Sequence, residues 1–161
     1  MSTRSAIGYF TPEKTVRAVY CHWDGYPSNN GRILMEHYTH EDKIMTLVSL
    51  GDISSLGQNI GFKKDFYPAD GRIHTETYFF GRDRSEKDVD PVEYADVQEY
   101  VEDMKSMNVE FVYLWNGSDW LVHDIHRQAW PGSADTILPD NGYPSFDFVE
   151  FVLAREDAEA A

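Results

Sequence analysis

The sequence predicts a single α+β domain, in which an antiparallel sheet is built from two β-hairpins and helices pack on one face of the sheet. Three observations lead to this class. Two pairs of segments alternate apolar and polar residues and are joined by short polar turns, which is typical of antiparallel hairpins. Other segments repeat apolar residues at intervals of three and four, as helices with one buried face do. Strands and helices alternate along the chain, and no long linker or internal repeat divides it.

The first hairpin is expected to join strands at 3–10 and 15–23 through a turn at 11–14. Arg4 lies near the start of the first strand, and His22 lies near the end of the second. Because these two ends lie side by side in an antiparallel hairpin, we expect Arg4 to approach His22 and the turn that follows it.

Two short helices should follow a loop at 24–31 that is rich in Gly, Asn and Pro. The first helix is expected at 33–38. The second begins after Thr39, which is expected to be its N-cap, and ends at Gly51. A third strand is then expected at 73–80.

The strongest helix signal lies at 90–104. Asp90 is expected to be the N-cap, with Pro91 in the first turn and Glu93 completing a capping box. One face of this helix is apolar, and the opposite face is acidic, through Glu99, Glu102 and Asp103.

A second hairpin is predicted between strands at 109–115 and 120–125, joined by the polar turn at 116–119. A long connection is expected to follow at 126–143.

The apolar segment at 146–154 fits both helical and strand spacing and is predicted to be helical. The single domain is expected to cover 1–155, ahead of an acidic C-terminal tail at 156–161.

Composition limits the function classes. The chain has 161 residues and a formal net charge of −14, a field that repels backbone phosphates and argues against direct binding to duplex nucleic acid. Such a surface suits a partner with a basic groove, although solubility alone also explains it. The single cysteine, Cys21, allows no intramolecular disulfide and no cysteine-based zinc site. Polar residues follow Met1, and no apolar run reaches the roughly 18 residues of a membrane span, so a cytoplasmic protein is expected.

The first candidate site is a ligand-binding group around the turn after His22. Arginine forks hold phosphate or carboxylate at two points, a histidine can act as acid, base or donor, and a tyrosine can stack on a ring. Three arginines gathered near one loop would form a local positive island suited to a small anionic ligand such as a nucleotide. The alternative is that Asp24 caps a turn and Asp83 pairs with an arginine on a surface loop. The residues of the ligand-binding hypothesis are Arg4, His22, Asp24, Tyr26, Arg82 and Arg84.

The second candidate is a partner-binding surface made by Glu99, Glu102 and Asp103, for which the alternative is an ordinary solvated helix face. Metal binding is not expected, because the histidine spacing matches no zinc motif. No catalytic residue and no cofactor are assigned. We expect one of Trp115 and Trp120 in the core and the other exposed, and an exposed tryptophan there would favour a homodimer.

Several short segments, mostly in the first half of the chain, carry a resemblance as a set: Ser2-Thr3-Arg4-Ser5-Ala6-Ile7-Gly8, Cys21-His22-Trp23-Asp24-Gly25-Tyr26-Pro27, Gly31 with His37-Tyr38, Leu50-Gly51-Asp52-Ile53-Ser54-Ser55-Leu56, and Gly81-Arg82-Asp83-Arg84. The set resembles a family of small proteins that bacteriophages and prophages carry, generally without an assigned function. The resemblance implies a phage accessory protein and supplies no catalytic residues. In the family pattern a glycine often follows the second arginine of the last segment, where this chain has Ser85.

Two functions follow as expectations. In the first, the protein acts in the cytoplasm of an infected host cell and binds, and thereby inhibits, a host or anti-phage defence protein through its acidic surface. In the second, it holds or hydrolyses a nucleotide or similar small anion that serves as a defence signal. Charge reversal at Glu99, Glu102 and Asp103 should weaken only the first function, and Arg82→Ala only the second.

Overall fold

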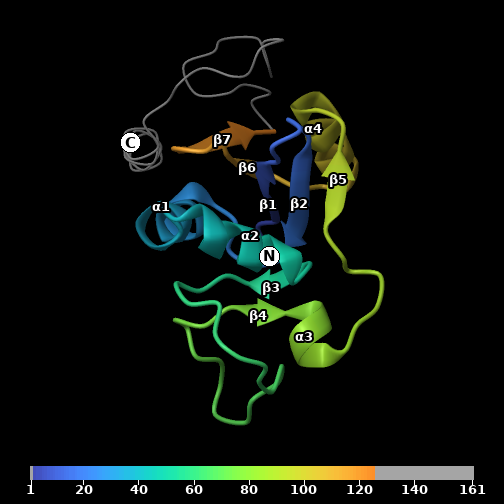
Figure 1. The fold of residues 1–161 in the computed structure, drawn as a ribbon. Helices are drawn as coiled ribbons and strands as arrows, with labels where there is room; N and C mark the ends of the chain where they lie inside the picture. Colours follow the sequence, from blue (N-terminus) through green and yellow to red (C-terminus); the bar gives the residue numbers. More distant parts are fainter. Residues whose placement is uncertain (1, 126–161) are drawn as a thin grey trace, which may run out of the picture.

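A mixed β-sheet runs through the computed structural model, which describes residues 2–125. Within this part of the chain the sheet has seven strands in the order β4-β3-β2-β1-β6-β7, and β5 pairs with the outer edge of β2 (Figure 1). The strands are β1 (Ser5–Phe10), β2 (Val16–Cys21), β3 (Ile53–Ser55), β4 (Tyr78–Phe79), β5 (Val92–Tyr94), β6 (Phe111–Trp115) and β7 (Trp120–Asp124). The helices are the π-helical turn η1 (Pro27–Gly31), α1 (Arg32–His37), α2 (Glu41–Ser49), α3 (Phe80–Arg84) and α4 (Val97–Ser106).

The α+β class is confirmed, but the expectation of a purely antiparallel sheet is wrong. β1 pairs with β2 antiparallel from Ser5↔Cys21 to Phe10↔Val16, and β6 pairs with β7 antiparallel. However, β1 lies parallel to β6, and β2 lies parallel to β3. The physical reason is that parallel neighbours need a long crossover connection, and the helices supply it: η1, α1 and α2 connect β2 to β3.

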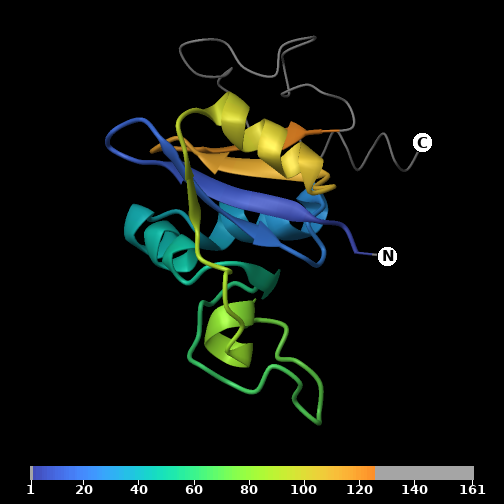
Figure 2. The same cartoon turned by 90° about the vertical axis from the view of Figure 1, so that its right-hand side faces the viewer.

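Helices cover both faces of the sheet, whereas one face was expected (Figure 2). Along β1, Ile7 and Tyr9 face a cluster that includes residues of α1 and α2, and Ala6 faces a second cluster that includes residues of α4. Both β6 and β7 are buried at every residue. Strands that are apolar on both sides need cover on both faces, which is why α4 lies opposite α1 and α2.

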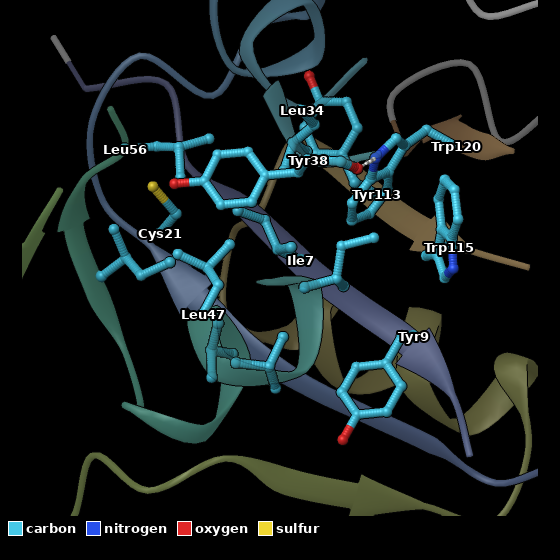
Figure 3. Packing of buried hydrophobic residues seen from close by; sticks show 14 of the residues in the cluster. Ile7, Tyr9, Cys21, Leu34, Tyr38, Leu47, Leu56, Tyr113, Trp115 and Trp120 are labelled. Carbon is cyan, nitrogen blue, oxygen red and sulfur yellow. Dashed lines mark hydrogen bonds between the residues drawn. The ribbon is translucent and has the colours of Figure 1, made fainter. Parts of the chain in front are cut away.

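The larger cluster packs around Tyr38, which is fully buried at the end of α1 (Figure 3). The indole Nε1 of Trp120 donates to the carbonyl oxygen of Tyr38 at 2.8 Å, and the Trp115 ring lies 5.5 Å from the Trp120 ring. Both tryptophans are buried, so the expectation that one of them is exposed is wrong. The argument for a homodimer through an exposed tryptophan therefore fails.

The helix expected to begin at Asp90 begins later. Its N-cap is Asp96, whose carboxylate accepts from the backbone N–H of Glu99 at 2.8 Å. The segment that contains Glu93 is instead the strand β5, which pairs with β2 at Val16↔Tyr94. The same Asp-x-x-Glu pattern occurs twice, and the first copy is extended because it supplies backbone partners to an open edge of β2.

The strand expected at 73–80 is reduced to Tyr78–Phe79, because the chain first forms a turn in which the Glu76 N–H donates to the Ile73 carbonyl at 3.0 Å, and then enters α3 at Phe80. The N-cap of α2 is His40 rather than Thr39, and no side chain caps this helix. The connection at 126–143, the helix at 146–154 and the tail at 156–161 lie outside the described residues, as does the expected end of the domain at 155. Within residues 2–125, no helix has both the length and the apolar character needed to cross a membrane.

Candidate functional site

The turn after β2 is fixed to the sheet by backbone hydrogen bonds. The N–H groups of His22 and Trp23 donate to the carbonyls of Ile53 and Ser54, both at 3.0 Å, which extends the β2–β3 pairing. Gly25 then donates to the carbonyl of Thr3 at 2.8 Å. A Cβ on Gly25 would lie only 2.5 Å from the Cβ of Ser5, so no other residue fits without a shift of the backbone.

Buried side chains hold the same turn from inside. The Asn30 amide is fully buried and donates to Ser5 Oγ at 3.2 Å and to Cys21 Sγ at 3.4 Å. The phenol of Tyr113 donates to the Gly25 carbonyl at 2.6 Å. Burial raises the pKa of the Cys21 thiol to about 11, so this cysteine is a neutral packing group rather than a nucleophile.

Arg4 and His22 come together, which confirms the expectation from the hairpin. The register Ser5↔Cys21, continued by one residue, places Arg4 across from His22. Tyr20 joins them, because its hydroxyl lies 2.7 Å from His22 Nδ1. Burial, and then the charge of Arg4, lower the pKa of His22, so its imidazole is neutral near pH 7. Arg4 Nε is buried without a hydrogen-bond partner among the described residues.

Arg82 has a structural environment. Its guanidinium donates to the backbone carbonyls of Ile60, Gly61 and Thr77 at 2.9–3.1 Å. It also meets both carboxylate oxygens of Asp83, at 3.0 and 3.2 Å. These bonds occupy all five donors of the guanidinium fork.

Arg84 also has partners away from His22. It donates to the Tyr67 hydroxyl at 2.8 Å and forms an ion pair with Glu86. Its guanidinium stacks over the rings of Phe66 and Phe80. The contacts of Arg82 and Arg84 share no residue with those of Arg4 and His22, so the structure does not gather the three arginines into one positive island.

Ser85 follows α3 in the left-handed conformation, with φ of 58°. A glycine would adopt this angle without strain.

A cavity of about 330 Å³ lies between the turn after β2 and the loop that precedes β4. This volume is at the lower end of the range for small-molecule sites. Asp24 is the member of the predicted ligand-binding group that lines it. The full lining comprises Asp24, Asn29, Ile33, His37, Ser55, Leu56, Gln58, Arg72, Ile73, His74, Thr75 and Glu76.

The part of the lining that comes from the loop before β4 is held by the buried hydroxyl of Thr77. This hydroxyl accepts from the Gly57 N–H at 3.0 Å and lies 3.3 Å from the phenol of Tyr38, which donates to the Gly57 carbonyl at 2.7 Å. A Cβ on Gly57 would approach the backbone of Thr75 and Glu76 to 2.6 Å, so the glycine allows the two chain segments to touch. The backbone that carries Glu76 is therefore as firmly held as the turn.

The two charged side chains of this wall differ in how far their hydrogen-bonding groups have partners. Arg72 donates to Ser54 Oγ at 2.9 Å, to Ser55 Oγ at 3.0 Å and to the Phe66 carbonyl. Glu76 Oε2, by contrast, is buried and has no hydrogen-bond partner among the described residues. An unpaired buried acceptor is rare and needs an explanation.

Sequence reasoning did not assign Arg72, His74 and Glu76 to a site. The alternation at 73–80 predicted a strand, but it gave no information on which part of the chain this segment lies beside. The glycines at Gly57 and Gly61 were the available signal, because closely spaced glycines in an irregular segment indicate close backbone contacts.

The acidic face of α4 is partly engaged within the molecule. The Glu99 carboxylate accepts from the N–H of Ala95, which precedes the N-cap Asp96, and the Asp96 carboxylate accepts from the N–H of Glu99. Asp103 accepts from the Tyr94 hydroxyl, and Glu102 accepts from the Gln98 amide at 3.2 Å. In the described part of the chain, no group of three or more His, Cys, Asp or Glu side chains is placed to hold a metal ion.

Comparison with protein-family models, with curated proteins and with solved structures finds no match to this chain.

Proposed function

We propose that this protein acts by non-covalent binding and holds a small polar ligand in the cavity between the turn after β2 and the loop before β4. The observation that carries this proposal is that buried hydrogen bonds hold the backbone of both segments, through Asn30 in the turn after β2 and through Thr77 in the loop before β4. A site whose walls are already held loses little conformational freedom when a ligand enters.

The composition of the cavity favours a ligand without phosphate. Asp24 and Glu76 bring two carboxylates to the lining. Arg72 is the arginine of the lining, and its guanidinium donates to two serine hydroxyls and to the Phe66 carbonyl. A nucleotide phosphate would therefore meet two like charges and one arginine that is already engaged.

A thermal-shift experiment tests the proposal. The melting temperature is measured with a panel of amines, amino acids, nucleosides and nucleotides. A ligand at 100 times its Kd should raise the free energy of unfolding by about 2.7 kcal/mol, and the melting temperature rises with it. Thr75→Trp fills the cavity from its lining, and Met45→Trp adds the same side chain on the exposed part of α2. The proposal requires a shift that persists in Met45→Trp and is lost in Thr75→Trp. A shift that survives in Thr75→Trp, or a panel without any shift, would overturn it.

A second candidate function is the capture of a host or anti-phage defence protein in the cytoplasm of an infected cell. The net charge of −14 and the exposed carboxylate of Glu102 support it, together with the resemblance to phage proteins. The carboxylates of Glu99 and Asp103 accept hydrogen bonds from Ala95 and Tyr94, which weakens the case for this face as a dedicated surface. Glu102→Lys should reduce capture of a basic partner more than Glu13→Lys, a change of equal charge in the β1–β2 turn. Equal reductions would mean that the overall charge acts, and not α4.

A further inference from the structure

Arg4, Tyr20 and His22 form a polar group at one end of the β1–β2 ladder, on the face of the sheet that α4 covers. Ala6 pairs with Tyr20, and the same register places Arg4 across from His22. Because side chains two residues apart on a strand share a face, all three lie on the side of Ala6, which packs in the cluster that includes residues of α4. None of the three belongs to the cavity lining, so this group is separate from the cavity.

Arg4, unlike Arg82 and Arg84, has no carboxylate partner in the described part of the chain. Each of the other two forms an ion pair, whereas within residues 2–125 no carboxylate oxygen lies within 4.0 Å of the guanidinium nitrogens of Arg4. The Nε of Arg4 is buried and unpaired, but neither terminal nitrogen is in that state, so the outer end of the guanidinium reaches the Tyr20 hydroxyl and solvent. This outer end is the part of an arginine that holds a phosphate at two points.

His22 presents its other ring nitrogen as a donor. Its Nδ1 lies 2.7 Å from the Tyr20 hydroxyl, and its Nε2 is not among the buried unpaired atoms and has no hydrogen bond to another described residue. Arg4 also forms a hydrogen bond with the Tyr20 side chain, and a guanidinium can only donate. The phenol oxygen therefore accepts from Arg4 and its proton points to Nδ1 of His22. The neutral imidazole then carries its hydrogen on Nε2, which is open to solvent.

The charge that acts on His22 is that of Arg4. Three acidic residues lie nearby in the fold: Asp24 in the turn, Asp52, which accepts from a backbone N–H of β2, and Glu110, whose N–H donates to the carbonyl of Arg4. None of their charges affects the pKa of His22, which burial and then Arg4 lower. An anion that contacts both Arg4 and His22 therefore meets donors without an opposing carboxylate beside the imidazole.

An aromatic surface borders the same histidine. The Trp23 ring lies edge-on to the imidazole of His22, with the ring centres 4.7 Å apart and an angle of 85° between the planes. The Trp23 side chain is 43% exposed, so part of the indole is free to contact a ligand. An exposed indole can stack on a planar ring such as a nucleobase.

We propose that Arg4 and His22 bind the phosphate group of a small phosphorylated compound, with Tyr20 as the residue that orients the imidazole. This site does not depend on the proposed function of the cavity. The net charge of −14 opposes the approach of an anion, but at physiological ionic strength this field is screened beyond about 8 Å. The two donors in direct contact with the phosphate therefore determine its binding, and the negative charge beside His22 favours the protonated imidazole.

The first test follows the ring signals of His22 by NMR, in the full chain at constant ionic strength. The nitrogen shifts of the free protein should be those of the tautomer with its hydrogen on Nε2, and Tyr20→Phe should reduce this preference. Titration with inorganic phosphate should move the midpoint of the His22 titration to higher pH. A hydrogen on Nδ1 in the wild type, or His22 signals that phosphate does not change, would overturn the proposal.

The second test compares two arginines of the same hairpin. Arg4→Gln removes the charge and the fork, and Arg17→Gln removes an equal charge on the opposite face, where Arg17 pairs with Tyr9. We expect Arg4→Gln to weaken phosphate binding by about tenfold to a hundredfold, the usual effect of losing hydrogen bonds to a charged group. Arg17→Gln should leave the affinity almost unchanged. Equal weakening by both variants would mean that the overall charge acts, and would also overturn the proposal.

The source of the phosphate group is distinguished by comparing AMP with ribose 5-phosphate. Tighter binding of AMP that is lost in Trp23→Ala indicates a nucleotide whose base stacks on the indole, and equal affinities indicate recognition of the phosphate alone. The variants also separate this site from the cavity. Binding of AMP that Thr75→Trp leaves intact and Arg4→Gln removes belongs to the site of Arg4 and His22, whereas the reverse pattern places AMP in the cavity and overturns this proposal for nucleotides.

Discussion

Replacing Arg82 by alanine tests whether this arginine holds the fold or a ligand. The variant loses hydrogen bonds to the carbonyls of Ile60, Gly61 and Thr77, which join the two segments before α3. It also leaves the Asp83 carboxylate, whose side chain is fully buried, without its arginine. Breaking a buried ion pair in this way typically destabilises a protein by about 3–5 kcal/mol. For a chain of this length, that lowers the melting temperature by about 10 °C or more.

The pH dependence gives a second readout of the same variant. Burial raises the pKa of Asp83, but hydrogen bonds from Arg82 and from the N–H groups of Phe79 and Lys64 outweigh it and hold the pKa below its ordinary value. A lowered pKa contributes stability above the unfolded-state value, near pH 4, and this contribution is lost as the pH falls. The difference in stability between the wild type and Arg82→Ala should therefore be largest near pH 7 and should shrink below pH 4.

Urea unfolding at pH 7 and at pH 3.5, followed by tryptophan fluorescence, measures both effects. Arg82→Lys serves as the control, because it keeps the charge but loses the planar fork, and should recover only part of the stability. An Arg82→Ala protein with unchanged unfolding free energy at pH 7 would refute the structural assignment. That result would return Arg82 to the ligand-binding group that the sequence suggested.

Three further predictions follow from single contacts. Burial raises the pKa of Asp52 to about 6, so the wild type loses folding free energy as the pH rises through that value. Asp52→Asn should therefore be more stable than the wild type by about 1–2 kcal/mol at pH 8 and equal to it at pH 3.5. Urea titrations at both pH values measure the difference, and equal stability at pH 8 would contradict the prediction. Gly25→Ala should lower the melting temperature by several degrees, since its Cβ would overlap Ser5, and an unchanged melting curve would contradict the tight turn. Asp96→Ala should cost about 1 kcal/mol of stability in urea unfolding and Asp90→Ala almost nothing, whereas the reverse order would place the helix start at Asp90.

The parts of the fold that depend on local pairing could be predicted from the sequence. The alternation in β1 and β2 and the short turn between them gave the register that brings Arg4 to His22. The parallel pairing of β1 with β6 could not be found in this way, because Ser5 and Phe111 are distant in the chain and no turn links them. Such pairings depend on how the crossover helices pack, which local periodicity does not encode.

The start of α4 shows a different limit. Asp90 and Asp96 are each followed by Glu after three positions, so the capping pattern alone gives two equal answers. The open edge of β2 decides between them, because it takes Val92–Tyr94 as a strand. Along this edge, β5 pairs with the first half of β2 and β3 pairs with its end. Between these two partners, the Asp52 carboxylate accepts from the Tyr20 N–H. A carboxylate in that place, with its raised pKa, is a consequence of tertiary pairing that a sequence pattern cannot show.

The candidate site was only partly predictable for a related reason. Asp24 was found because it lies in a turn with strong local signals, whereas Glu76 lies in an irregular segment whose position is set by contacts with Tyr38 and Gly57. The sequence placed Arg82 in the ligand-binding group because residue type alone does not distinguish a guanidinium that binds a ligand from one that joins backbone carbonyls. Arg82 is the second kind.

The density of polar groups in the turn after β2 now has two separate explanations. Cys21, Gly25 and Asn30 face inward, where the chain packs against Ser5, and they exist to fix the backbone. Asp24 faces the cavity, and the neighbouring Trp23 side chain is exposed. Because the first group positions the second, a change such as Asn30→Ala should weaken binding in the cavity without touching the ligand. In that variant the loss of affinity should accompany a loss of stability, whereas Asp24→Asn should lose affinity alone, and this contrast separates the framework of the turn from its recognition surface.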